Sequence, residues 1–301
     1  MLEVLDQSTL NFDQGSLFIL NISLAIIMFG VALDLKVADF KAILTNPRSF
    51  LAGILSQFIF LPFLTWVFVL FVNPPPSVAL GMFLVAACPG GNVSNFLSHL
   101  AKGNAALSVS LTGFSTLFSI FLTPFNFALW AGFYAPSAKI LREISLSYFD
   151  VFQTVALILG IPLIVGILIN SRFPSWSQKA TKILKPLSIL IFAAFVAIAF
   201  IGNYKLFLQF IGLIFLWVLG HNLLGLASGF SLAKIFKLDL PDTKTLTIET
   251  GIQNSGLGLV LIFTYFDGLG GMAIIAAWWG IWHIISGMAI ALYWKNTPSI
   301  K

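Results

Sequence analysis

The stretch LTIETGIQNSGLGLVLIF, residues 246–263, decides the fold of this chain. It is apolar at both ends, but Glu249 and a polar run at Gln253 and Asn254 interrupt its middle. An ionised carboxylate at the centre of a membrane helix costs at least ~2.5 kcal/mol, so such residues in spans usually have a function. The stretch is therefore predicted to be a membrane helix that is broken near its middle and carries a functional carboxylate.

The composition places the rest of the chain in a membrane as well. The 301 residues are 58% hydrophobic and only 9% charged, and their mean hydropathy is +0.98. A soluble domain carries roughly 25% charged residues. So few charges cannot cover a surface in water, and the lipid bilayer is expected to be the solvent for most of the chain. The single cysteine, Cys88, excludes an internal disulfide.

Nine apolar segments are long enough to cross the bilayer, since a span needs about 20 residues. Backbone in lipid must hydrogen-bond within itself, so long continuous apolar runs predict helices. The expected fold is an all-α polytopic membrane protein with a single transmembrane domain over residues 1–301. The predicted spans are residues 16–35, 49–72, 77–101, 104–132, 148–170, 184–203, 207–234, 243–266 and 270–294.

The basic residues predict the orientation. Of the 16 Lys and Arg residues, only Lys139, Arg142 and Lys205 fall on one side of the nine predicted spans. All the others fall on the opposite side, which the positive-inside rule assigns to the cytoplasm. The N-terminus is therefore predicted outside and the C-terminus in the cytoplasm. This pattern also explains the net charge of +5 without a nucleic acid partner.

A second interrupted span, ACPGGNVSNFLSHL at residues 87–100, lies in the first half of the chain. Pro89, Gly90 and Gly91 are poor residues for a helix interior. Polar residues follow directly: Asn92, Ser94 and Asn95. One broken helix in each half of a chain indicates a transporter binding site between inverted repeats. At each break, the first half-helix is expected to end in carbonyls without donors, which attract a cation. The second half-helix is expected to begin with free N–H groups, which attract an anion.

Oxygen-bearing side chains that suit a hard cation gather in and near the two breaks. No Lys or Arg lies in the core of any predicted span, so Glu249 must be protonated or bound to a metal ion. Hard cations take several oxygen ligands. The candidates are Glu249, Gln253, Asn95, Ser94, Ser108, Thr112 and Gln57. For Ser108 and Thr112, which share one helix face, hydrogen bonding between helices is the simpler alternative.

The remaining reactive side chains do not favour an enzyme. An intramembrane metalloprotease needs a His-rich motif, and an aspartyl type needs two acids in the membrane. This chain has three His residues, far apart, and one acid inside a span. His221 and His283 are predicted to be hydrogen-bonding residues of helix packing. Cys88 has no activating base and is predicted to be a small buried residue.

Four motifs together resemble the bile acid:sodium symporter family. They are CPGGNVSN at 88–95, LAKGNAALSVSLTGFSTL at 100–117, LTIETGIQNSGL at 246–257 and WHIISG at 282–287. The resemblance, from about residue 18 to 294, implies inverted repeats, two broken crossing helices, and a core and a panel domain. Panel helices would be about 16–35, 148–170 and 184–203, and core helices about 49–132 and 207–294. The expected location is a bacterial inner (plasma) membrane.

The family resemblance implies two sodium sites behind the crossing. Residues that match the first site are Ser94, Asn95, Ser108, Thr112 and Glu249. Residues that match the second are Gln57, Glu249, Thr250, Ile252 and Gln253, where Thr250 and Ile252 would contribute backbone carbonyls. The acid group of a substrate is expected near the half-helix N-termini, at Gly91, Asn92, Asn95, Asn254 and Ser255.

The expected function is sodium-coupled symport of organic anions by alternating access, with two sodium ions per anion. Bile acids and small carboxylates such as pantoate or a keto acid both suit the resemblance as substrates. The alternative is a proton-coupled carrier of the same fold in which Glu249 titrates. The expected partners are sodium, the organic anion and the lipid bilayer, with neither a nucleic acid nor an obligate protein partner.

Overall fold

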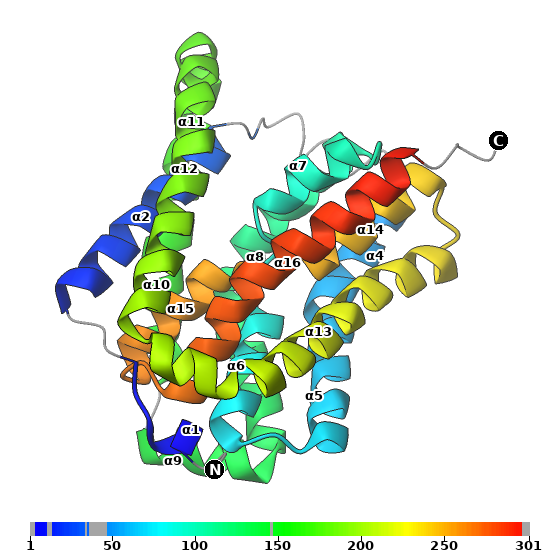
Figure 1. Ribbon diagram of the computed structural model, residues 1–301. Coiled ribbons are helices and arrows are strands. Elements are labelled where there is room, and N and C mark those ends of the chain that lie inside the picture. The colour runs from blue at the N-terminus through cyan, green and yellow to red at the C-terminus, as the bar shows by residue number, and fades with distance from the viewer. Residues whose placement is uncertain (1–3, 11–13, 34, 36–46, 145–146, 297–301) are drawn as a thin grey trace.

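The structure, a computed structural model, describes residues 4–10, 14–33, 35, 47–144 and 147–296 (Figure 1). In this part of the chain the only regular elements are helices, joined by short connections and two isolated β-bridges. Five helical runs among these residues are long and apolar enough to cross a membrane. They are Pro47–Val72, Ala105–Phe133, Tyr148–Arg172, Phe207–Ile235 and Gly270–Asn296. The chain is therefore an integral membrane protein with a helical fold.

Described helices cover most of each of the nine predicted spans, while the number of membrane crossings stays a prediction. In the first half they are α1 Val4–Gln7, α2 Gln14–Ala32, α4 Pro47–Leu55, the π-helix η1 Ser56–Phe60, α5 Leu61–Val72, α6 Pro76–Ala87, α7 Val93–Leu100, α8 Ala105–Phe133 and α9 Ala135–Ile144. In the second half they are α10 Tyr148–Val155, the π-helix η2 Ala156–Gly160, α11 Ile161–Arg172, α12 Pro174–Gly202, α13 Tyr204–Ile235, α14 Leu240–Gly251, α15 Ser255–Tyr265 and α16 Gly270–Asn296.

The breaks predicted in the third and eighth spans are confirmed. α6 ends at Ala87 before α7 begins, and α14 ends at Gly251 before α15 begins. The two unwound segments pair with each other, because Gly91 N donates to Ile252 O at 2.6 Å and Asn254 N donates to Pro89 O at 2.9 Å. The two broken helices therefore cross at their breaks.

The helices form two groups around this crossing. α2, α11 and α12 pack on one another and stand side by side at the left of Figure 1. α6 and α15 lie in the other group and pack on α16, and their residues are buried almost throughout. A helix that is apolar on all sides belongs inside a bundle. α2 instead exposes large apolar side chains such as Phe18 and Ile19, as a lipid-facing helix does.

The N-terminal segment packs on connections that were predicted to lie on one side of the membrane. Asp6 Oδ1 accepts a hydrogen bond from Ser77 N at 2.8 Å, at the start of α6. Leu10 N donates to Gly268 O at 2.9 Å, in the connection before α16. α1 and the last turn of α16 lie at opposite ends of the bundle in Figure 1. This arrangement agrees with the predicted alternation of the loops.

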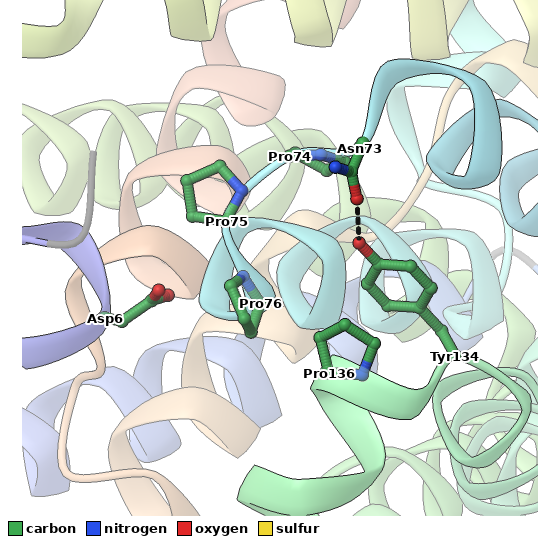
Figure 2. A pocket seen from close by; sticks show the side chains of 7 residues that line it. All are labelled: Asp6, Asn73, Pro74, Pro75, Pro76, Tyr134 and Pro136. Atoms are coloured by element: carbon green, nitrogen blue, oxygen red, sulfur yellow. Dashed lines mark hydrogen bonds between the residues drawn. The ribbon is translucent and has the colours of Figure 1, made fainter.

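An open pocket lies at the same end of the molecule (Figure 2). Its lining comes from α1, the α5–α6 connection and the start of α9: Asp6, Asn73, Pro74, Pro75, Pro76, Tyr134 and Pro136. The Tyr134 hydroxyl donates to Asn73 Oδ1 at 2.8 Å across it. The pocket shares no residue with the predicted ion and substrate sites.

Gly225 and Gly229 lie one turn apart on α13 and allow it to approach α14 closely. A Cβ at Gly229 would lie 2.8 Å from Thr247 Cα, a backbone atom that cannot rotate away. Small residues serve such close contacts between membrane helices. Gly229→Ala is therefore expected to lower the free energy of unfolding by about 1–3 kcal/mol. Thermal unfolding in detergent would measure the loss.

The matched control is Gly212→Ala on the same helix, where an added Cβ meets nothing within 4 Å. Alanine has the higher helix propensity, so this variant should be at least as stable as the wild type. Equal losses for the two variants would contradict the role assigned to the α13–α14 contact.

Candidate functional site

Glu249 lies in the last turn of α14, beside the crossing, and is 5% exposed. Its carboxylate accepts hydrogen bonds from hydroxyls of two other helices. Ser94 of α7 donates to Oε2 at 2.5 Å, and Ser108 of α8 donates to the same oxygen at 3.1 Å. Thr112 of α8 donates to Oε1 at 2.6 Å. The hydrogen bonds described for this carboxylate thus all come from neutral groups.

The Asn95 side-chain amide joins this group of oxygen-bearing side chains. Ser108 Oγ lies 2.8 Å from Asn95 Oδ1, and Thr112 Oγ1 lies 3.1 Å from it. Each of these hydroxyls thus faces both Asn95 and Glu249, but a hydroxyl carries a single hydrogen. Each hydroxyl can therefore donate to one of its two neighbours at a time. The cluster gathers carboxylate, hydroxyl and amide oxygens, which are ligands that a hard cation takes.

Gln57 and Gln253 form a second polar group at the crossing. Gln57 lies in η1, the π-helical turn between α4 and α5, a distortion often found at functional sites. Gln57 Nε2 donates to Gln253 Oε1 at 2.7 Å and to Cys88 O at 2.9 Å. Gln253 Nε2 donates to Thr250 O at 2.7 Å. The structure thus brings the side chains of Gln57 and Gln253 and the Thr250 carbonyl together.

The carbonyls at the breaks are not free, which corrects the expectation that they end the half-helices without donors. Thr250 O accepts a hydrogen bond from Gln253 Nε2, and Ile252 O accepts one from Gly91 N. Gly251 O accepts from Asn222 Nδ2 at 2.8 Å, and Ala87 O from Thr123 Oγ1 at 2.7 Å. Buried carbonyls need partners, and in this fold amide and hydroxyl side chains supply them. A carbonyl oxygen has two lone pairs, so it can still bind a cation.

The residues predicted to contact a substrate lie where the second half-helices begin. Asn92 and Asn254 are the N-cap residues of α7 and α15. Asn254 Oδ1 accepts from Leu257 N at 3.1 Å, which leaves its amide group for other partners. Ser255 is 1% exposed, and its hydroxyl has no hydrogen-bond partner among the described residues. Gly91 belongs to the paired segment, and the Asn95 side chain lies beside the Ser108 and Thr112 hydroxyls that also reach Glu249.

Two buried charged residues of α14 were not predicted. Lys244 is 5% exposed, and its Nζ donates to Ala101 O at 2.9 Å and to Trp294 O at 3.3 Å, not to Glu249. Asp242 accepts from Ser49 Oγ and from Asn104 Nδ2. Their position near the predicted span boundary made them resemble loop residues. Their contacts tie α14 to α7, α16, α4 and the start of α8.

Three further predictions concern side chains outside the site. His221 is buried, and its Nε2 hydrogen-bonds with Thr65 Oγ1 at 2.8 Å, which confirms its predicted role in helix packing. His283 is also buried, but its Nδ1 has no hydrogen-bond partner in the described part of the chain. Cys88 is buried, as predicted.

Two broken helices that cross at a buried carboxylate are typical of the secondary transporter class of membrane proteins. The family model of the Sodium Bile acid symporter family matches residues 21–210. The chain belongs to this family, which comprises sodium-dependent transporters of bile acids and metabolites.

Three relatives illustrate the range of the family. The sodium-dependent transporter YocS of Bacillus subtilis is 35% identical over 299 residues, which cover 98% of this chain and 90% of YocS. The human ileal sodium/bile acid cotransporter is 30% identical over 241 residues, 79% of this chain and 67% of that protein. The probable sodium/metabolite cotransporter BASS1 of Arabidopsis thaliana chloroplasts is 27% identical over 277 residues, 92% of this chain and 66% of BASS1.

Proposed function

We propose that this protein is a sodium-coupled symporter of organic anions that carries two sodium ions with each anion. The buried cluster of oxygen-bearing side chains around Glu249 supports this proposal most directly. Ser94, Ser108 and Thr112 donate hydrogen bonds to the Glu249 carboxylate. The Asn95 amide lies beside the hydroxyls of Ser108 and Thr112 and completes a set of four side chains around the carboxylate. Sodium is a hard cation that prefers such oxygen ligands.

The first sodium ion would bind Glu249 together with these four side chains. The hydroxyls would turn their hydrogens away and present oxygen lone pairs to the ion. The second ion would bind Gln57, Gln253 and the backbone carbonyls of Thr250 and Ile252, with Glu249 nearby. To admit this ion, the Gln57–Gln253 hydrogen bonds, at 2.7 and 3.2 Å, would have to rearrange. Both ions would then hold the two unwound segments in one geometry.

The anion would bind on the other side of the crossing. The N-termini of α7 and α15 carry the positive ends of their helix dipoles, which attract an acid group. Asn92, Asn254, Gly91, Asn95 and Ser255 would provide polar contacts there. Because the relatives are named for bile acids and for other metabolites, a bile acid or a small carboxylate is the proposed substrate class.

Transport would proceed by alternating access between two domains. α2, α10–α11 and α12 would form the panel domain, and the helices of 49–132 and 207–294 the core domain, with the broken helices related as inverted repeats. The protein would have its N-terminus outside and its C-terminus in the cytoplasm, in a bacterial inner membrane. It would act as a carrier and not as an enzyme.

Thermal stability in sodium and in potassium tests this proposal without a known substrate. A ligand that binds only the folded protein stabilises it by RT ln(1 + [L]/Kd), about 2.7 kcal/mol at one hundred times Kd. Purified protein is expected to unfold at a higher temperature in sodium chloride than in potassium chloride of equal ionic strength. Identical unfolding temperatures over a wide range of sodium concentrations would contradict the proposal.

The same assay separates sodium coupling from the alternative, coupling to protons. A proton would occupy one carboxylate oxygen, whereas a metal ion can contact all the oxygens of the cluster. For a proton carrier, the unfolding temperature would depend on pH and not on the choice of alkali ion. Uptake into proteoliposomes would then follow a pH gradient in the absence of sodium.

A further inference from the structure

Met28 of α2 contacts both broken helices, although α2 packs mainly with α11 and α12. Leu20, Leu24 and Met28 are spaced four residues apart on α2 and are buried, whereas Ile22 and Ile26 on the other side of the helix are exposed. The buried side packs toward the core cluster that contains α15. Met28 belongs to this series and is completely buried.

The Met28 sulfur lies between the side-chain amides of two N-cap residues. Asn92 Nδ2 and Asn254 Nδ2 each lie 3.8 Å from Met28 Sδ, within reach of a weak N–H···S hydrogen bond. One amide begins α7 and the other begins α15, so a single acceptor atom meets the second halves of both broken helices. No other side chain of α2 has a described hydrogen bond to the crossing.

A thioether is a poor partner for this position. Sulfur of methionine is a weak acceptor, whereas the two amides together carry four N–H hydrogens. Asn92 and Asn254 are half-buried, and donors that are partly withdrawn from water without a good acceptor cost free energy. The two amides therefore suit an oxygen acceptor better than the sulfur that they face.

We propose that Met28 is the residue of α2 that closes the anion site, where its sulfur occupies the place of a substrate oxygen between the Asn92 and Asn254 amides. This inference rests on the proposed function, because it assigns the gate of the same anion site. Methionine is unbranched and flexible, so its side chain can withdraw when an acid group binds. Its withdrawal would loosen the contact of α2 with both broken helices and so couple anion binding to movement of the panel.

Two substitutions test whether the amides need an oxygen at this position. Met28→Gln keeps the length of the side chain and offers a strong oxygen acceptor, while Met28→Leu keeps the apolar character and offers none. We expect the unfolding temperature of Met28→Gln to exceed that of Met28→Leu. A residue that only fills an apolar core would give the opposite order, and that order would overturn the proposal.

The matched control is Leu24→Gln, which introduces the same side chain one turn earlier on α2. Leu24 is 3% exposed and belongs to the same buried side of α2, with no described amide contact. Leu24→Gln is expected to lower the unfolding temperature, because it buries an amide in apolar surroundings. If Leu24→Gln were as stable as Met28→Gln, the preference would not be specific to the crossing.

Chemical labelling tests whether Met28 leaves this position for an anion. Met28→Cys would be treated with methanethiosulfonate reagents that carry either a sulfonate or a quaternary ammonium group. The negative reagent is expected to react at least about tenfold faster, because two amides and two helix N-termini attract it. Leu24→Cys should react slowly with both, and the wild type supplies the background from buried Cys88.

The outcomes distinguish this inference from the proposed function. Equal rates for the two reagents, or a Met28→Cys rate as low as that of Leu24→Cys, would overturn the role of Met28. If sodium still raised the unfolding temperature of the same variant, sodium binding would stand. In a further outcome, sodium leaves the unfolding temperature of the wild type unchanged while Met28→Cys still reacts faster with the negative reagent. That result would overturn sodium coupling and leave the role of Met28 at the anion site standing.

Discussion

Glu249→Gln is expected to abolish sodium-driven uptake and to remove the difference in thermal stability between sodium and potassium. Glutamine keeps the shape of the side chain but lacks the charge that holds a cation among hydroxyl and amide oxygens. The lost charged interaction, about 3 kcal/mol, corresponds to a loss of affinity of about 100-fold. In potassium the variant should be at least as stable as the wild type, since a buried charge has been removed. Uptake in proteoliposomes and thermal unfolding would measure both effects.

The matched control for this variant is Asp242→Asn in the same half-helix. Asp242 is 2% exposed, and its carboxylate also accepts hydrogen bonds from neutral side chains. The substitution makes the same chemical change at the other end of α14, away from the crossing. It is expected to leave the sodium-specific stabilisation intact, even if overall stability falls. Unchanged sodium-driven uptake in Glu249→Gln would contradict the proposed sodium site.

Gly90→Ala is expected to weaken sodium binding at the same site, although it replaces none of the proposed sodium ligands. A Cβ at Gly90 would lie 2.7 Å from Glu249 Oε1 and 3.3 Å from its Cδ, so the carboxylate would have to move. Movement would separate Oε1 from Thr112, which donates to it at 2.6 Å. We expect the apparent sodium affinity to fall about tenfold or more. A tenfold change corresponds to ~1.4 kcal/mol of binding free energy. The sodium concentration that gives half-maximal stabilisation would measure this effect.

Gly258→Ala in α15 is the control for the second prediction. An added Cβ there would lie 3.8 Å from Cys88 Sγ, which is ordinary contact distance. Alanine also favours a helix more than glycine does, so stability should be maintained or rise. A sodium affinity in Gly90→Ala equal to that of Gly258→Ala would show that the carboxylate tolerates the added methyl group.

The helical membrane fold and the two breaks could be predicted from the sequence because their causes are local. A long apolar run by itself indicates that the segment lies in lipid. Pro89, Gly90 and Gly91 interrupt a helix through their own backbone properties. Glu249 stood out because it was the only acid in the interior of a predicted span, whereas the other ten lie in loops or at span ends. The unpredicted helix α9 lies between spans, where the sequence carries no hydropathy signal.

The arrangement inside the site could be predicted only in part. The resemblance gave Ser94, Ser108 and Thr112 as companions of Glu249, and the structure brings their hydroxyls to the carboxylate. Two contacts could not be predicted from spacing or hydropathy. One is the hydrogen bond from Asn222 to Gly251 O, and the other is the position of Met28 between the amides of two N-cap residues. Methionine and asparagine are ordinary residues in a span, so nothing in the sequence singled them out.

By itself, the sequence determined that the bilayer is the solvent, that two helices break, and that one carboxylate lies at the second break. These properties depend on neighbours along the chain. Only the tertiary structure decided which oxygens share the hydrogens around Glu249 and how Gln57 meets Gln253, 196 residues away. Hydrogen bonds require positions accurate to a few tenths of an ångström. That accuracy comes from the crossing of helices that are distant in sequence, which hydropathy and local backbone preference do not encode.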